Sequence, residues 1–174
     1  GYKFIFFNEE LNSTGQIILR HDIDFDIDKA LEFAKFENEL GVNSTYFFLM
    51  RSDSYNFLEP KCLEIINSIK DLGHQVSLHF DPTQYEDFKD GLKKEIKHFE
   101  YFTDQKINVI SFHRPPKFFL NLDDKIDNIT HTYQKKFFKD IKYISDSGGD
   151  FFYENPIECE EFKNFKTIQF LTHP

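Results

Sequence analysis

The segment from Ile17 to Asp24 runs from an apolar strand into ionisable residues, and its two carboxylates are spaced as chemistry would require. Side chains alternate faces along a strand, so Asp22 and Asp24 leave the same face about 7 Å apart. Two carboxylates so placed can share a metal ion and a water, one as ligand and the other as base. Aspartates are also common loop and helix-cap residues, and a predicted helix follows directly. This segment alone leaves both interpretations open.

Further residues capable of acid-base or metal chemistry stand where the predicted strands end. They are Asp22 and Asp24, His79 and Asp81, His113 and Arg114, Asp146, and His173. The carboxyl ends of parallel strands are where α/β barrels and sheets place their active sites. A single histidine at such a position is more often structural. Several strands that deliver Asp, His and Arg to one rim favour an enzyme over a scaffold.

The elements that would position these residues alternate between strand-like and helix-like segments, which predicts an α/β fold with a parallel sheet or barrel. Strands are expected at 17–24, 42–50, 75–80, 107–112, 142–145 and 166–172. Helices are expected at about 26–40, 59–72, 84–102 and 156–164. The polar region 117–140 is expected to hold loops and a short helix, and 146–150 a turn-rich tip.

Length and composition predict one domain over residues 1–174, large enough to bury about 70% of its unfolded surface. The 23 phenylalanines and the absence of tryptophan indicate an aromatic core, and 29% charged residues are typical of a soluble globular protein. No run of about 18 apolar residues could span a membrane. The first residues lack a cleavable-signal pattern, so a cytoplasmic location is the default expectation.

Charge and cysteine usage narrow the partners. The net charge of -9 and the scatter of the 21 Lys and Arg residues argue against binding to nucleic acid. Cys62 and Cys159 have no cysteine nearby, which excludes a zinc-ribbon spacing and argues against a disulfide framework. We expect two buried, reduced thiols and a small-molecule partner. The oligomeric state is left open.

Six motifs in order resemble those of the polysaccharide deacetylase (NodB-homology) family, from about residue 16 to the last. They are Arg20-His21-Asp22-Ile23-Asp24, Ser44-Thr45-Tyr46-Phe47-Phe48, Gly73-His74-Gln75-Val76-Ser77-Leu78-His79, Phe112-His113-Arg114-Pro115-Pro116, Ser145-Asp146-Ser147 and Leu171-Thr172-His173-Pro174. The resemblance implies an irregular (β/α) barrel. It also implies a divalent metal that helps to remove acyl groups from N-acyl sugars or to hydrolyse related amides.

The resemblance also implies roles for individual residues. Asp22 would be the general base that activates a metal-bound water, and Asp24 and His79 would be metal ligands. Arg114 matches the arginine that orients the base, His173 matches the histidine that protonates the leaving amine, and Asp146 falls in the motif that supports this histidine. The chemistry fits these residue types. An amide carbonyl needs polarisation, water needs deprotonation near neutral pH, and an amine must be protonated before it leaves.

One position departs from the family pattern. The family usually supplies two histidines four residues apart, but Thr83 stands four residues after His79. Catalytic zinc sites generally keep three protein ligands and one open position, so a third ligand must come from elsewhere. Asp81 and His113 are the two candidates. We prefer His113, because an imidazole from another strand preserves a nitrogen-rich ligand set.

The sequence therefore predicts a metal-dependent hydrolase that removes an acyl group from an N-acylated carbohydrate, such as a cell-envelope polysaccharide. Zinc is the expected metal, with cobalt, nickel and manganese as alternatives. Two other functions stay open, a degenerate barrel that binds a sugar without hydrolysis and a hydrolase of another linear or cyclic amide. The presence of both Asp22 and His173 favours catalysis, since a binding module needs neither base nor acid. The substrate could be free, nucleotide-linked or lipid-linked.

Overall fold

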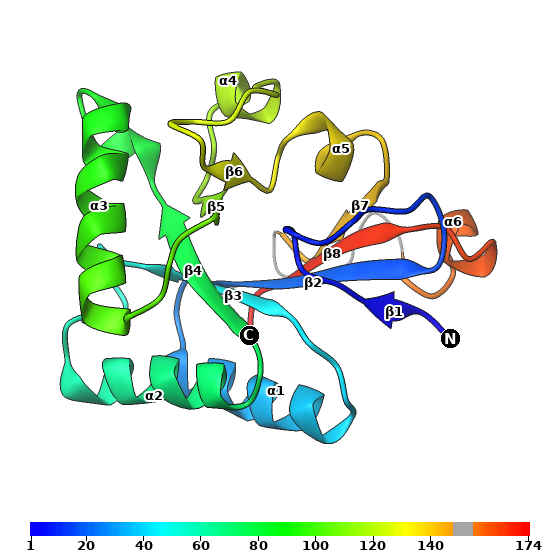
Figure 1. Cartoon of the computed structure of the whole chain (residues 1–174), viewed down its shortest axis with the longest axis horizontal. Helices are drawn as coiled ribbons and strands as arrows, with labels where there is room; N and C mark the ends of the chain where they lie inside the picture. Colours follow the sequence, from blue (N-terminus) through cyan, green and yellow to red (C-terminus); the bar gives the residue numbers. More distant parts are fainter. Residues whose placement is uncertain (148–154) are drawn as a thin grey trace.

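The computed structural model describes residues 1–147 and 155–174, in which eight strands form one curled sheet (Figure 1). The strands are β1 (Lys3–Phe4), β2 (Gln16–Ile23), β3 (Thr45–Leu49), β4 (Gln75–Phe80), β5 (Val109–Phe112), β6 (Thr130–His131), β7 (Lys142–Ser145) and β8 (Ile168–Thr172). Their order is β6-β5-β4-β3-β2-β8-β7, with β1 beside β2. Every pairing between these strands is parallel, as the alternating sequence pattern predicts.

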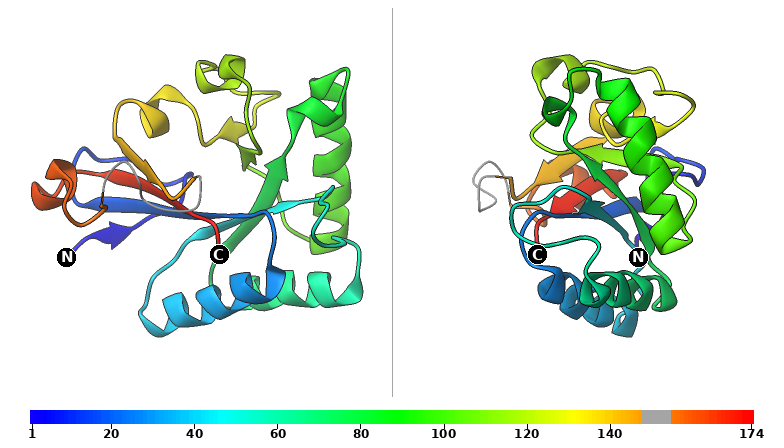
Figure 2. Two further views of the ribbon diagram at one scale, coloured as in Figure 1. Left: turned by 180° about the vertical axis from the view of Figure 1, so that it is seen from behind. Right: turned by 90° about the vertical axis from the view of Figure 1, so that its left-hand side faces the viewer.

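Three longer helices cover the outside of the sheet (Figures 1 and 2). They are α1 (Ile27–Glu39), α2 (Pro60–Asp71) and α3 (Phe88–Thr103). Helices α1 and α2 lie side by side under one face, and α3 stands next to β4. Short turns complete the described elements, namely η1 (Pro82–Gln84), α4 (Lys117–Leu120), α5 (Lys135–Phe138) and α6 (Glu160–Lys163). The predicted α/β fold, an irregular (β/α) barrel, is confirmed as a curled half-barrel with flanking helices.

Helix α1 begins where it does because Asp26 caps it. The Asp26 carboxylate accepts hydrogen bonds from the backbone N–H groups of Asp28 and Lys29, which have no partner inside the helix. Buried Ile27, Ala30 and Ala34 follow at helical spacing and pack into the main core. The cap fixes the direction of the chain just after β2, and therefore the position of the residues at the end of that strand.

The two faces of the sheet have different contents. The outward residues of β3, β4 and β5 pack with α1, α2 and α3 in the main core, which includes Phe48, Leu78 and Ile110. A second apolar cluster fills the other face and contains Ile5, Phe7, Ile18, Phe47, Val109 and Phe137. Because side chains alternate, Asp22 lies on the face of Ile18, four residues further towards the carboxyl end. The inside of the half-barrel is thus apolar towards the amino ends of the strands and polar towards their carboxyl ends.

Some elements differ from the sequence expectations. Strands β1 and β6 were not predicted, because two-residue strands carry no periodicity. The helix expected at 84–102 begins only at Phe88, because Asp81 and Asp87 cap two separate elements, η1 and α3. The helix expected at 156–164 is reduced to α6. Part of the turn expected at 146–150, residues 148–150, lies outside the described residues.

Two smaller expectations concern thiols and membrane spans. Both Cys62 and Cys159 are free and buried, as the sequence predicts. None of the helices in the described part of the chain combines the length and apolar character that crossing a membrane demands.

We expect Gly91→Ala to destabilise the protein, although alanine normally favours a helix interior by about 1 kcal/mol. A Cβ at Gly91 would lie 2.3 Å from Cγ of Tyr85. The Tyr85 ring stacks on Phe80, and its hydroxyl donates to buried Glu95 at 2.5 Å, so it cannot move away cheaply. Overpacking of this kind costs about 1–3 kcal/mol, measurable as a lower urea midpoint. The control is Lys97→Ala, an exposed change on the same helix; a Gly91→Ala midpoint at or above the wild-type value would contradict the prediction.

Candidate functional site

A cavity of about 740 Å³ opens at the carboxyl ends of the strands. Its lining residues are Asp22, Asp24, Phe25, His79, Phe112, His113, Arg114, Pro115, Leu120, Tyr133, Asp146, Ser147, Leu171 and His173. The volume lies within the range that is typical of small-molecule sites. All seven residues that the sequence assigns to catalysis or metal binding line this cavity. How they contact one another decides what each can do.

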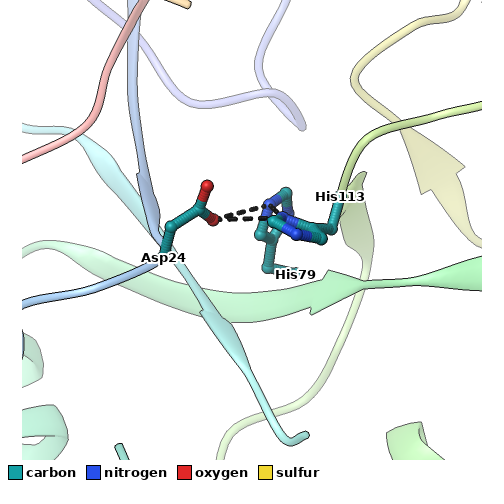
Figure 3. A group of neighbouring side chains, drawn as sticks. All are labelled: Asp24, His79 and His113. Carbon is teal, nitrogen blue, oxygen red and sulfur yellow. Dashed lines mark hydrogen bonds and ion pairs between the residues drawn. The ribbon is translucent and has the colours of Figure 1, made fainter. Parts of the chain in front are cut away.

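Asp24, His79 and His113 form a compact triad at the ends of β2, β4 and β5 (Figure 3). Asp24 Oδ1 lies 3.2 Å from His79 Nε2 and 3.2 Å from His113 Nδ1. The two ring nitrogens are also 3.2 Å apart. The three potential ligand atoms therefore stand at the corners of a nearly equilateral triangle. The side chains are half-buried or buried, which limits competition from bulk water.

The triad fits a divalent metal ion in spacing and in chemistry. Ligand atoms about 2.0 Å from a tetrahedral zinc ion are about 3.3 Å from one another, close to the distances above. Asp24 Oδ1 is buried and accepts no well-aligned hydrogen bond from the described residues, so a cation would meet an unsatisfied lone pair. Burial would raise the pKa of Asp24, but the neighbouring His113 and His79 outweigh burial and hold this pKa well below its usual value.

The alternative ligand Asp81 is engaged elsewhere. Its carboxylate accepts hydrogen bonds from the backbone N–H of Thr83 at 2.9 Å and from the Thr83 hydroxyl at 2.6 Å. Asp81 is therefore a cap for η1, and Thr83 is its partner. Within the described residues, the only group of three or more His, Cys, Asp or Glu side chains close enough to hold an ion consists of Asp24, His79 and His113.

Asp22 lines the cavity beside the triad and is only 2% exposed. Its Oδ2 accepts hydrogen bonds from Arg20 Nη2 and from Ser111 Oγ, both at 3.0 Å. The same oxygen is 3.8 Å from His79 Nε2. Its Oδ1 is buried and has no hydrogen-bond partner among the described residues. The carboxylate thus has one occupied oxygen and one free oxygen.

The arginine that contacts Asp22 is Arg20, whereas the family resemblance implies that Arg114 orients this residue. Arg114 adopts a left-handed backbone conformation with φ 43° and lies exposed at the rim of the cavity. It makes no ion pair or hydrogen bond with Asp22 in the described part of the chain. The sequence did not predict a role for Arg20, because an arginine within an apolar strand looks like an interruption of the pattern. Its spacing could have indicated one, since residues i and i+2 of a strand share a face and Arg20 is two residues before Asp22.

His173 faces the same cavity from the end of β8 and is paired with Asp146 at the end of β7. His173 Nδ1 lies 2.6 Å from Asp146 Oδ1, and the His173 backbone N–H donates to Asp146 Oδ2 at 2.9 Å. Burial would lower the pKa of His173, but the Asp146 hydrogen bond and the carboxylates of Asp22 and Asp24 outweigh it and raise this pKa above its ordinary value. The sequence predicted that His173 faces the same cavity as Asp22 and that Asp146 is the acidic partner of His173.

The remaining histidines lie outside this site. His21 is held between Thr172 Oγ1 and Glu37 Oε1, each at 2.7 Å, on the opposite face of the sheet. His74 and His131 each contact a backbone carbonyl oxygen. His98 is exposed on α3, as its place off the apolar face predicts. These four positions have structural explanations.

Comparisons with known proteins identify the fold. A scan against family models finds no match for this sequence, and a search of curated proteins finds none at the threshold applied. Among solved structures, a family 4 carbohydrate esterase from Bacillus anthracis matches with a TM-score of 0.56 at 14% identity, covering 89% of this chain and 66% of that one. A mutant of a CE4 family pseudoenzyme with restored enzymatic activity matches with a TM-score of 0.53 at 16% identity, covering 91% of this chain and 56% of that one.

The chain therefore has the fold of the CE4 carbohydrate esterases with a divergent sequence, and it spans less than two thirds of the length of either matched structure. At 14% and 16% identity, this likeness concerns the fold. The resemblance to polysaccharide deacetylases that the motifs indicate is thus confirmed at the level of the barrel. What the site does must be argued from its own residues.

Proposed function

We propose that this protein is a metal-dependent hydrolase that removes an acyl group from an N-acylated carbohydrate. The observation that supports this most strongly is the triangle of Asp24, His79 and His113, with 3.2 Å between each pair of ligand atoms, next to a buried carboxylate with a free oxygen. This arrangement offers a Lewis-acid site and a base together. Zinc is the metal that best suits two imidazoles and one carboxylate.

The residues divide the reaction between them. A divalent ion in the triad would polarise the acyl carbonyl and lower the pKa of a nearby water. Asp22 takes a proton from that water with its free Oδ1. His173 lines the same cavity with its pKa raised, and it donates a proton to the amine as the amide bond breaks. Asp146 holds Nδ1 of His173, which leaves Nε2 to face the substrate.

The second candidate is a barrel that binds a sugar without hydrolysing it. The observation that favours it is Thr83, which occupies the position of the family's second histidine and bonds to Asp81 instead. If His113 did not replace the missing ligand, the protein could keep its cavity and lose its metal. A hydrolase of another linear or cyclic amide would use the same residues and differ in substrate alone.

The test of the metal site compares His113→Ala with the wild-type protein. We expect the wild-type protein to bind one zinc ion per chain, because three ligands converge. His113→Ala should bind zinc at least about 10-fold to 100-fold more weakly, since loss of even an outer partner of a metal ligand costs that much. Zinc titration by calorimetry on the folded variants measures the difference. Equal zinc affinity in both proteins would remove His113 from the ligand set.

A matched control addresses the position that departs from the family pattern. Thr83→Ala should leave zinc affinity unchanged, because Thr83 contacts Asp81 and not the triad. The wild-type protein loaded with zinc, cobalt or nickel should release acetate from one or more N-acetylated sugars in a panel of monosaccharides and oligosaccharides. Binding of such a sugar without acetate release would favour the sugar-binding barrel.

A further inference from the structure

The two oxygens of the Asp22 carboxylate differ in their surroundings. Oδ2 accepts two hydrogen bonds, one from Arg20 Nη2 and one from Ser111 Oγ, each 3.0 Å long. Oδ1 has no partner among the described residues although it is buried. A buried carboxylate oxygen without a donor is costly, so it is expected to meet a ligand or a water. The structure therefore distinguishes an anchored oxygen from an available one.

Arg20 is itself fixed on several sides. It is fully buried, and its Nη1 donates to Gln169 Oε1 at 3.1 Å. Its Nη2 also donates to the Tyr133 hydroxyl at 3.2 Å, and the guanidinium lies over the rings of Tyr133 and Tyr143 at 5.1 Å and 5.9 Å. A guanidinium stays charged when buried and donates along fixed directions. Its contact with Asp22 is therefore a charge-assisted hydrogen bond of defined geometry.

Ser111 reaches Asp22 from a strand that is not its neighbour. Ser111 lies on β5 and pairs in register with His79 of β4, whereas Asp22 is on β2. The bond between Ser111 and Asp22 therefore crosses the inside of the barrel. Ser111 is fully buried, so bulk water does not compete for its hydroxyl. Two donors from different strands approach one oxygen, and together they fix the plane of the carboxylate.

We propose that Arg20 and Ser111 are positioning residues that hold Oδ2 of Asp22 and so make Oδ1 the atom that accepts the proton. This inference rests on the proposed hydrolysis for its reaction. In that reaction an O–H bond of the attacking water breaks and its proton passes to Oδ1, while the water oxygen bonds to the acyl carbon and the C=O π pair moves onto the carbonyl oxygen. The C–N bond then breaks as that pair returns, and the amine leaves with a proton from His173. Arg20 thereby performs the orienting role that the family resemblance assigned to Arg114.

The physical basis is restricted rotation. With Arg20 alone, the carboxylate can rock about its Cβ–Cγ bond around a single hydrogen bond. A second donor from another direction restricts this rocking, because turning away from the observed plane weakens both bonds; a half-turn only exchanges two equivalent oxygens. Misplacing a reacting group by about 1 Å can cost on the order of 100-fold in rate. Loss of Ser111 should therefore reduce turnover without changing how substrate or metal binds.

The test compares Ser111→Ala with Ser77→Ala. Ser77 is a buried serine on neighbouring β4, but its hydroxyl donates to the backbone oxygen of Val109 and does not touch Asp22. We expect Ser111→Ala to lower kcat about 10-fold, which corresponds to one charge-assisted hydrogen bond, with KM and zinc affinity unchanged. Ser77→Ala should keep the wild-type kcat. An unchanged kcat in Ser111→Ala, or an equal fall in Ser77→Ala, would overturn the proposal.

A second readout does not depend on activity. Crystal structures of the metal-free proteins should show Asp22 Oδ2 on Arg20 and Ser111 in the wild type and an ordered water on Oδ1. In Ser111→Ala the carboxylate should rotate or occupy two orientations, and in Ser77→Ala it should not. An unmoved carboxylate in Ser111→Ala overturns the inference whatever the activity. A wild-type protein that binds zinc but hydrolyses no substrate refutes the proposed function instead, while these structures still decide the orientation.

Arg20→Lys supplies an independent variant. Lysine keeps the charge but replaces the guanidinium fork with a single ammonium group, so it cannot contact Gln169, Tyr133 and Asp22 in the same geometry. We expect a larger fall in kcat than in Ser111→Ala, again with unchanged zinc affinity. A folded Arg20→Lys protein with the wild-type kcat would overturn the role of Arg20.

Discussion

Asp22→Asn is expected to lower kcat for hydrolysis of an N-acetyl sugar by about 10²- to 10⁴-fold, the usual contribution of a general base. The substitution nearly preserves shape, so zinc affinity should change little. The amide is expected to turn its oxygen towards Arg20 and Ser111, because both are donors to that position. Its NH₂ group would then occupy the place of Oδ1. The lone pair of that nitrogen is delocalised into the amide carbonyl and does not accept a proton, so the base is lost.

Two further measurements make this result specific. Asp24→Ala should lose activity together with the metal, whereas Asp22→Asn should lose activity and keep it. Measuring the zinc content of both variants therefore distinguishes loss of a metal ligand from loss of the base. A crystal structure of Asp22→Asn should keep both contacts of the anchored atom. An Asp22→Asn protein that is fully folded, loaded with zinc and as active as the wild type would exclude Asp22 as the base and with it the proposed mechanism.

The convergence of Asp24, His79 and His113 was predictable from sequence because it depends on topology. Asp24, His79 and His113 each follow a strand, and parallel strands bring their carboxyl ends to one edge. The parallel pairings of β2 with β3, β3 with β4, and β4 with β5 place these ends in sequence order. Hydrophobic periodicity and turn residues were enough to predict that these three residues lie at the same edge of the sheet. The preference for His113 over Asp81 followed from ligand chemistry and stays a prediction, and in the structure the Asp81 carboxylate accepts a hydrogen bond from Thr83.

The absence of a contact between Arg114 and Asp22 in the described part of the chain has a local cause. Residue 114 adopts a left-handed conformation between His113 and Pro115, which leaves His113 in the cavity and the arginine exposed. No spacing rule for strands applies in such a turn. Arg20 lies in regular strand, where alternation does predict that it shares a face with Asp22. Its burial depends on Gln169, Tyr133 and Tyr143, which come from distant parts of the chain.

His173→Ala is expected to lower kcat by about 10²- to 10⁴-fold and to abolish the decline of activity at alkaline pH. The reason is the raised pKa of His173, which Asp146 and the carboxylates of Asp22 and Asp24 maintain against the effect of burial. A general acid works while it is protonated. Wild-type kcat should therefore persist above the ordinary histidine pKa of 6.5 and fall as the pH passes the raised value. Measurements of kcat between about pH 6 and 9 follow this limb.

Asp146→Asn should have a pH profile intermediate between those of the wild type and His173→Ala. It removes one carboxylate from His173 but leaves the ring in place, so the pKa of His173 should fall and the alkaline decline should move to lower pH. The same pairing contributes stability that is fully present below pH 6.5 and is lost as the pH rises through the raised pKa. The free energy of unfolding of the wild type should therefore decrease across that window, and that of His173→Ala should not.

The matched control for His173 is His98→Ala, since His98 is an exposed histidine on α3 outside the cavity. It should change neither the kcat profile nor the pH dependence of stability. Full activity of His173→Ala across pH 6 to 9 would remove His173 from the mechanism and leave protonation of the amine to another group. A loss of activity in His173→Ala without any change in the alkaline limb would instead make His173 a substrate-binding residue, because only a proton donor links the rate to its own titration.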